Sequence, residues 1–243
     1  MKTDYRHELK YWAIVPAAGI GKRMNTDTPK QYLQINGKML IEHTLERLIK
    51  FPLFEKIIVV LSKDDKYASD INILRHKKIV LAEGGKERYH SVINGLKSLN
   101  SLADDNDWVM VHDAARPCVR QTDIAWLVES LRTHDVGGVL GSVVKDTIKR
   151  VDSNDTIIET IDRTTLRHTF TPQMFKWKAL TEALTLSVTH GVYVTDEAGA
   201  MEHAGYKPMM VEGYSDNIKV TSKEDLALAA LYIEQQSKLT ENL

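Results

Sequence analysis

The chain has 243 residues, 43% of them hydrophobic, and its 32 basic and 33 acidic side chains leave a formal net charge of −1. This composition supports a sizeable core and excludes a broad electrostatic footprint for nucleic acid or a membrane surface. The single cysteine, Cys118, excludes an intramolecular disulfide and fits a reducing compartment. Because no secretory signal or bilayer-length apolar run is visible, we expect a cytoplasmic protein.

Strand-like runs alternate with helix-like segments through the first half of the chain. The expected strands are residues 12–15, 56–61, 78–82 and 108–111, and the expected helices are 40–49, 65–75 and 87–99. Repeated strand–helix units predict a Rossmann-like α/β fold, a mostly parallel sheet flanked by helices, in a single domain over 1–243. Ligands of such sheets bind beyond the carboxyl ends of the strands.

The segment from about 143 to 163 interrupts this alternation. Two strand-like runs, 147–151 and 156–161, flank a turn at 152–155, which predicts a projecting β-hairpin arm. An isolated two-stranded arm is marginal in water, so we expect it to pack either on a second subunit or back on its own domain. The remaining expected elements are a helix begun by Pro172, a helix at 196–204, a strand at 206–212 and a helix at 224–236.

The loop after the first strand reads PAAGIGKRM over residues 16–24 and is followed by PKQY at 29–32. Small residues and glycines let backbone N–H groups approach a phosphate, and Arg23 and Lys30 add two positive charges. The loop matches neither the P-loop pattern nor the dinucleotide fingerprint. It indicates a nucleotide triphosphate site, with a tight strand-to-helix turn as the alternative.

Two further loops follow predicted strands. In 84–91, two glycines allow close approach to a planar ligand, and Ser91 either contacts a base or holds the next helix. In 112–117, Asp113 is placed to position a divalent metal such as Mg²⁺ or a substrate hydroxyl. Arg116 would pair with Asp113 or with a ligand phosphate, and we expect His112 to be an orienting or core residue.

Two later segments add cations and hydroxyls. Lys219 lies on a predicted short strand at 217–221, where it would face either a ligand or solvent. At the foot of the arm, Arg163 and Thr171 together suit a phosphate. Thr171 would alternatively cap the helix begun by Pro172.

Taken jointly and in chain order, these segments resemble the 2-C-methyl-D-erythritol 4-phosphate cytidylyltransferases of the non-mevalonate isoprenoid pathway. The resemblance covers nearly the whole chain, and it rests on the segments PAAGIGKRM, PKQY, GGKERYHSV, HDAARP, KDTIKR, DR at 162–163, TPQ at 171–173, TDEA at 195–198 and DNIKVT. It implies that CTP and a polyol phosphate react, with Mg²⁺, to give a CDP-linked alcohol and pyrophosphate. It also implies a homodimer in which the arm of one subunit completes the site of the other.

The resemblance further implies roles for individual positions. The residues implied to bind the nucleotide are Ala17, Ala18, Gly19, Gly21, Gly85 and Ser91. Those implied to offset phosphate charge during catalysis are Arg23, Lys30 and Lys219. Those implied to bind the second substrate are Asp113, Arg116, Thr147, Arg163, Thr171 and Thr195, with Asp113 also the candidate metal ligand beside the CTP phosphates.

Two other functions remain compatible with the sequence. A ribitol 5-phosphate cytidylyltransferase would share the fold and the chemistry, and a non-catalytic nucleotide-binding protein would share the fold alone. The retention of Arg23, Lys30, Asp113 and Lys219 together favours an enzyme. Lys86 departs from the pattern, because relatives often carry an acidic residue after the double glycine.

Overall fold

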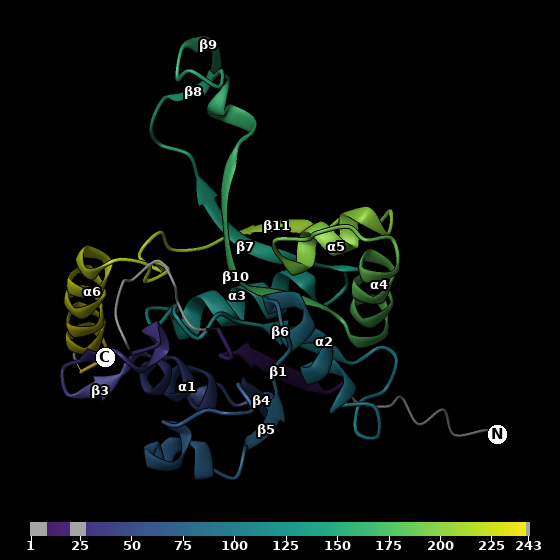
Figure 1. The fold of residues 1–243 in the computed structure, drawn as a ribbon, viewed down its shortest axis with the longest axis vertical. Helices are drawn as coiled ribbons and strands as arrows, with labels where there is room; N and C mark the ends of the chain where they lie inside the picture. Colours follow the sequence, from purple (N-terminus) through teal and green to yellow (C-terminus); the bar gives the residue numbers. More distant parts are fainter. Residues whose placement is uncertain (1–8, 20–27, 242–243) are drawn as a thin grey trace.

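The computed structural model describes residues 9–19 and 28–241, built around a seven-stranded sheet (Figure 1). Its strands are β1 (Tyr11–Pro16), β4 (Phe54–Leu61), β5 (Ile79–Glu83), β6 (Trp108–Val111), β7 (Gly137–Val143), β10 (Arg167–Lys176) and β11 (Met209–Glu212). They lie in the order β11-β7-β10-β6-β1-β4-β5. Only β10 runs antiparallel to its neighbours β6 and β7, so the prediction of a mostly parallel sheet is confirmed.

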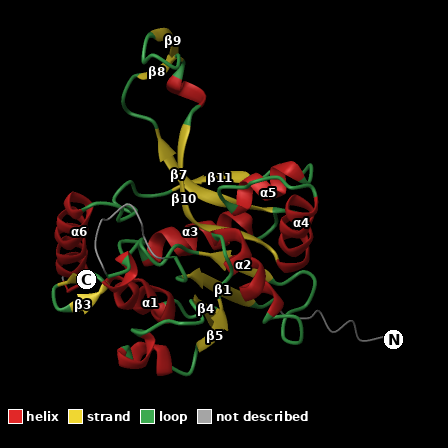
Figure 2. Cartoon of the chain, in the orientation of Figure 1, coloured by secondary structure: helices red, strands yellow, loops and turns green. Residues whose placement is uncertain are grey.

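Helices cover both faces of the sheet (Figure 2). The described helices are α1 (Leu40–Lys50), α2 (Arg88–Lys97), α3 (Gln121–Leu131), α4 (Trp177–Thr189), α5 (Glu197–His203) and α6 (Lys223–Glu241). Side chains of β1 alternate between the faces: Ala13 and Val15 pack with α1 and α3, while Trp12 and Ile14 pack with α2, α4 and α5. Burial on both faces explains why the strands read as continuous apolar runs.

The closing helix α6 packs on a third, smaller apolar cluster. That cluster includes Ile35 from a two-stranded ribbon, β2 (Gln34–Ile35) and β3 (Lys38–Met39), and the buried Cys118. Burial raises the pKa of the Cys118 thiol to about 12, and its Sγ donates to the Ala229 carbonyl at 3.7 Å. Cys118 is therefore a packing residue of this cluster. Among the described helices, none is both long and apolar enough to cross a membrane.

The arm predicted at about 143–163 is a two-stranded hairpin of β8 (Ile148–Val151) and β9 (Ile157–Ile161). It stands away from the sheet at the ends of β7 and β10 (Figure 1). The side chains of Ile157 and Ile158 are each 60% exposed, so the arm presents apolar surface. The hairpin is confirmed, and its contact with a second subunit stays a prediction.

Pro172 lies inside β10, so the helix predicted to begin there is wrong. The register between β10 and β7 shifts between Thr169 and Gln173, and a proline is tolerated at such an irregularity because no ladder bond is needed from its nitrogen. Thr171 consequently caps no helix. Its buried hydroxyl accepts a hydrogen bond from the Asp113 N–H at 3.0 Å.

Two other expected elements differ from the structure. Residues 65–75 form two short 3₁₀ turns, Ala68–Asp70 and Asn72–Arg75, in place of one helix. The Asp65 carboxylate accepts from the N–H groups of the residues two and three positions on, a local turn that competes with a helix. Residues 217–221 form a loop in place of the expected strand.

Candidate active site

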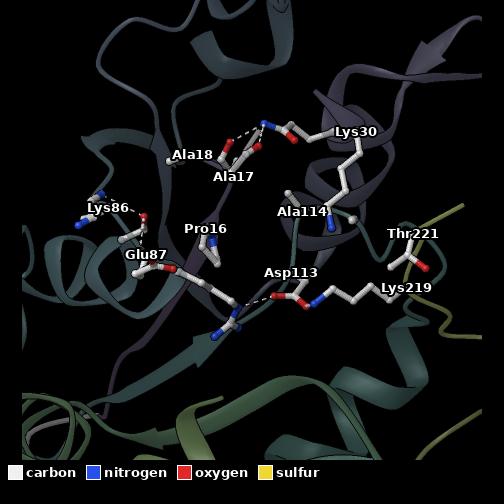
Figure 3. A pocket seen from close by; sticks show the side chains of 16 residues that line it. Pro16, Ala17, Ala18, Lys30, Lys86, Glu87, Asp113, Ala114, Lys219 and Thr221 are labelled. Atoms are coloured by element: carbon white, nitrogen blue, oxygen red, sulfur yellow. Dashed lines mark hydrogen bonds and ion pairs between the residues drawn. The ribbon is translucent and has the colours of Figure 1, made fainter. Parts of the chain in front are cut away.

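A cavity of about 570 Å³ opens beyond the carboxyl ends of β1, β5 and β6 (Figure 3). Three strand-end loops line it, and Lys219 and Thr221 close it from the loop before α6. The predicted site residues that line it are Ala17, Ala18, Gly19, Lys30, Gly85, Ser91, Asp113 and Lys219. Gly21 and Arg23 lie outside the described residues.

A side chain that sequence reasoning did not single out fixes the backbone of the loop after β1. The buried Gln31 donates from Nε2 to the carbonyls of Ala17 at 2.7 Å and Gly19 at 3.0 Å. These bonds fix the backbone of the small-residue loop, while the neighbouring Lys30 lines the cavity. A glutamine directly after a predicted phosphate-binding lysine is the only sequence signal for this role.

The loop after β5 lies against the loop after β1. A Cβ atom at Gly84 would fall 2.3 Å from the Ala18 Cβ, so only glycine permits this approach. The Ser91 Oγ accepts from the Gly85 N–H at 3.1 Å and donates to the Glu87 carbonyl at 3.4 Å. Ser91 therefore ties the Gly85 loop to the start of α2 and also lines the cavity, while its predicted contact with a base stays a prediction.

Asp113 is the electrostatic centre of the cavity. Its Oδ1 accepts from the Arg88 Nε at 2.9 Å, its Oδ2 lies 2.7 Å from the Lys219 Nζ, and the Arg116 Nε is 3.9 Å away. Figure 3 shows Asp113 and Lys219 pointing toward one another. Burial alone would raise the pKa of this carboxyl, but the three cations outweigh it and hold the pKa well below its usual range.

Arg88 and Glu197 extend this charge cluster into the interior. The Arg88 Nη1 and Nη2 donate to the two carboxylate oxygens of Glu197 at 2.7 and 3.1 Å. Glu197 is fully buried at the start of α5, whereas Arg88 begins α2 and reaches the cavity. Neither residue was predicted as functional, because two charges 109 positions apart carry no sequence signal of pairing.

The loop that carries Lys219 is anchored on both sides of that residue. The Val220 N–H donates to the Ala115 carbonyl at 2.8 Å. Asn217 donates from Nδ2 to the Thr171 carbonyl at 2.8 Å and accepts, at its own carbonyl, from the Arg116 Nη1 at 2.7 Å. Of the two alternatives considered for Lys219, the structure has the side chain lining the cavity, although from a loop and not from the expected strand.

The remaining predicted substrate residues lie outside the cavity lining of this single chain. Arg116 and Thr171 are buried behind Asp113, and Thr195 is exposed just before α5. Thr147 and Arg163 are exposed on the arm, where the Arg163 Nη1 donates to the Lys145 carbonyl. Their predicted contacts with a substrate phosphate stay predictions.

The donors present suit a cation shared with a ligand better than a protein-enclosed metal. No group of three or more His, Cys, Asp or Glu side chains within 9–19 and 28–241 is arranged to hold a metal ion. The described carboxylates lining the cavity are Asp113 and Glu87. Mg²⁺ commonly binds through one or two carboxylates together with substrate phosphates and water, so the residues fit Mg²⁺ carried on a nucleotide.

Comparisons with known proteins agree with this geometry. Residues 11–235 match the family model IspD, 2-C-methyl-D-erythritol 4-phosphate cytidylyltransferase. A curated enzyme of that name from Vibrio vulnificus is 50% identical over 224 residues, 92% of this chain and 94% of the relative.

Two solved structures resemble the whole fold. A crystal structure of 4-diphosphocytidyl-2C-methyl-D-erythritol synthase superposes with a TM-score of 0.81 at 33% identity, covering 93% of this chain and 99% of that one. The Francisella tularensis 2-C-methyl-D-erythritol 4-phosphate cytidylyltransferase gives a TM-score of 0.78 at 36% identity, covering 92% and 99%. The chain therefore belongs to the 2-C-methyl-D-erythritol 4-phosphate cytidylyltransferase family.

Proposed function

We propose that this protein transfers a cytidylyl group from CTP to 2-C-methyl-D-erythritol 4-phosphate, giving 4-diphosphocytidyl-2-C-methyl-D-erythritol and pyrophosphate for isoprenoid precursor synthesis. Family membership supports this function. The observation that carries the chemistry is the cavity itself, in which Lys30 and Lys219 face the small-residue loop after β1. A triphosphate and a phosphate monoester meeting there need that positive charge.

The reaction requires little from the protein beyond position and charge. The substrate phosphate attacks the α-phosphorus of CTP in line, and pyrophosphate leaves. Because the attacking phosphate is already anionic, no strong general base is needed. Lys30 and Lys219 offset the negative charge that develops on the crowded phosphates, and Asp113 orients the polyol.

Mg²⁺ is part of the proposal. Asp113 and the CTP phosphates would hold it, and a bound Mg²⁺ neutralises phosphate charge and orients the leaving group. Lys30 lines the cavity where we propose that the triphosphate binds. The protein therefore supplies positive charge to the triphosphate whether or not Mg²⁺ contacts a side chain.

We also propose a homodimer with composite sites in the cytoplasm. The exposed apolar side chains of the arm support association, because a two-stranded hairpin gains stability by packing on another surface. Thr147 and Arg163 are exposed on the arm, and a partner's cavity is where their hydroxyl and guanidinium would meet a substrate phosphate. The buried, unpaired thiol of Cys118 suits a reducing compartment.

Replacing either cavity lysine tests the assigned chemistry. Lys30→Ala and Lys219→Ala should each lower kcat by about 100-fold or more, as the loss of one transition-state donor does in other enzymes. Pyrophosphate release from CTP, Mg²⁺ and methylerythritol phosphate measures the rate. Lys178→Ala is the matched control, because that lysine forms an exposed ion pair with Asp105 away from the cavity and should leave kcat unchanged.

The same assay separates the candidate substrates. Near-normal turnover in both cavity variants, with the fold intact by circular dichroism, would contradict the roles of Lys30 and Lys219. Faster pyrophosphate release with ribitol 5-phosphate than with methylerythritol phosphate would overturn the choice of substrate. CTP binding without turnover of either alcohol would indicate a nucleotide-binding protein.

A further inference from the structure

The ammonium group of Lys219 has two possible anionic partners, the Asp113 carboxylate and the transferring phosphate. In the structure its Nζ lies 2.7 Å from the Asp113 Oδ2, whereas the proposed function places that charge on the transferring phosphate. When Lys219 turns to the phosphate, Asp113 loses its closest cation. The Asp113 side chain is only 9% exposed, and a buried carboxylate without a partner cation is costly. A second cation of the protein would keep the Asp113 carboxylate paired at that stage, in addition to any Mg²⁺ carried by the nucleotide.

Arg88 is placed to be that cation. Its Nε donates to the Asp113 Oδ1 at 2.9 Å, on the oxygen opposite the one that Lys219 contacts. Arg116 is less well placed, because its Nε is 3.9 Å from Asp113 and its Nη1 is committed to the Asn217 carbonyl. Arg88 therefore makes the one direct hydrogen bond from a guanidinium to Asp113 among the described residues.

Glu197 fixes Arg88 in this position. The Arg88 Nη1 and Nη2 each donate to one Glu197 oxygen, and this pairing aims the Nε of the planar guanidinium at Asp113. Glu197 is itself held by its helix: the Asp196 carboxylate caps α5 at the Gly199 N–H, and the Gln173 Oε1 accepts from the Ala198 N–H at 2.9 Å. A bidentate pair on a fixed helix start gives Arg88 a single orientation.

We propose that Arg88 and Glu197 are a positioning pair that keeps the Asp113 carboxylate fixed and paired when Lys219 engages the phosphate. The inference rests on the proposed function of Lys219. Arg88 acts through Asp113, so removing it should matter only while Asp113 is a carboxylate.

A double-mutant cycle with Asp113→Asn tests this dependence. The variant Arg88→Met/Glu197→Gln removes both charges of the positioning pair, which avoids leaving Glu197 buried without a partner. In the wild-type background it should lower kcat by about 10- to 100-fold. On Asp113→Asn it should lower kcat by less than about threefold, because residues that act through one another are not additive.

Lys30→Ala provides the matched background. Lys30 lines the cavity from the 3₁₀ turn after the first loop, and removing the positioning pair there should again lower kcat by about 10- to 100-fold. Melting temperatures are recorded for every variant. If Arg88→Met alone unfolds, the paired substitution keeps the test available.

Each outcome decides one claim. If Arg88→Met/Glu197→Gln lowers kcat by the same factor in the Asp113→Asn background as in the wild type, the inference is overturned. That result would indicate that Arg88 contacts the substrate directly. Wild-type kcat in Arg88→Met/Glu197→Gln would overturn it as well, leaving a purely structural ion pair. Failure of the proposed function is a separate result, since it would appear as normal turnover in Lys219→Ala or Lys30→Ala.

Discussion

His112 is a hydrogen-bonded core residue beneath the site. It is fully buried, with its Nε2 3.0 Å from the Arg116 carbonyl and its Nδ1 3.1 Å from the Thr171 hydroxyl. Burial lowers the pKa of His112 to about 4, so the imidazole is neutral at neutral pH. The same Thr171 hydroxyl accepts from the Asp113 N–H, and His112 thereby orients the backbone that carries Asp113. This position agrees with the prediction of an orienting or core residue.

Asp123 is a buried carboxyl away from the cavity, and it should make stability depend on pH. Its Oδ1 accepts from the Tyr214 N–H at 3.1 Å, and its Oδ2 has no hydrogen-bond partner among the described residues. Burial raises the pKa of Asp123 to about 6 from an ordinary value of 3.8. The folded state therefore binds more protons than the unfolded state between these values. Its stabilising contribution is complete below about pH 4 and is lost as the pH rises through about 6.

Asp123→Asn should remove this dependence. Asparagine keeps an acceptor for Tyr214 and carries no charge, so the unfolding free energy of the variant relative to wild type should rise by about 1–3 kcal/mol between pH 4 and pH 7. Urea unfolding at several pH values measures it. A difference that is constant with pH would mean that Asp123 titrates normally.

The two loops that line the cavity after β1 and β5 share one steric constraint, at Gly84. Gly84→Ala would place a methyl group 2.3 Å from the Ala18 Cβ and push the two loops apart. We expect the Kd for CTP to rise about tenfold or more, about 1.4 kcal/mol, measured by calorimetry. Gly95→Ala is the control: its Cβ would meet the Ile14 Cγ2 at 2.8 Å in the core, so it should lower the melting temperature and spare CTP affinity.

Elements with a strong local pattern could be predicted, and those whose pattern is set by distant neighbours could not. The apolar runs of β1, β4 and β6 and the small-residue loop gave the sheet and its ligand edge. Strand β7 was not predicted, because its glycines are not typical of a strand. Cβ atoms at Gly137 and Gly138 would each fall 2.2 Å from a carbonyl oxygen of an adjacent strand. Those glycines answer tertiary crowding that no window of sequence displays. The helix α3 was also not predicted, and the helix expected from Pro172 begins later, at Trp177.

The candidate site shows the same division. Most of the residues that line the cavity could be predicted, because they lie in polar or glycine-rich loops that follow predicted strands. Gln31 and Arg88 also line the cavity but act on neighbouring groups of the protein, and Glu197, the partner of Arg88, is fully buried. A buried charge pair in a sequence resembles any two surface charges, so only the folded chain identifies it.

The proposed homodimer with composite sites predicts how a mixture of two variants should behave. Arg163→Ala should remove the arm's contribution and Lys219→Ala the cavity's, so each homodimer should be nearly inactive when the alcohol phosphate is well below its KM for the variant. Mixing and re-equilibrating the two should restore about a quarter of wild-type activity, because half the dimers are mixed and each has one intact site.

Light scattering and the unmixed variants are the controls. Activity that stays at the level of the separate variants, or a fully active monomer, would contradict arm exchange. Arg163→Ala alone should chiefly raise KM for the alcohol phosphate and leave the KM for CTP unchanged.

The antiparallel direction of β10 has a consequence for how this fold can vary. Val143 at the end of β7 pairs with Arg167 at the start of β10, so everything between them occupies the place of a simple reverse turn. Doubling the length of such a closed loop costs only about 0.6 kcal/mol. Insertions and deletions there should leave strand register and the cavity untouched. The body of the chain therefore sets no limit on the length of the arm, and the limit comes instead from the proposed reach of Thr147 and Arg163 into a partner's cavity.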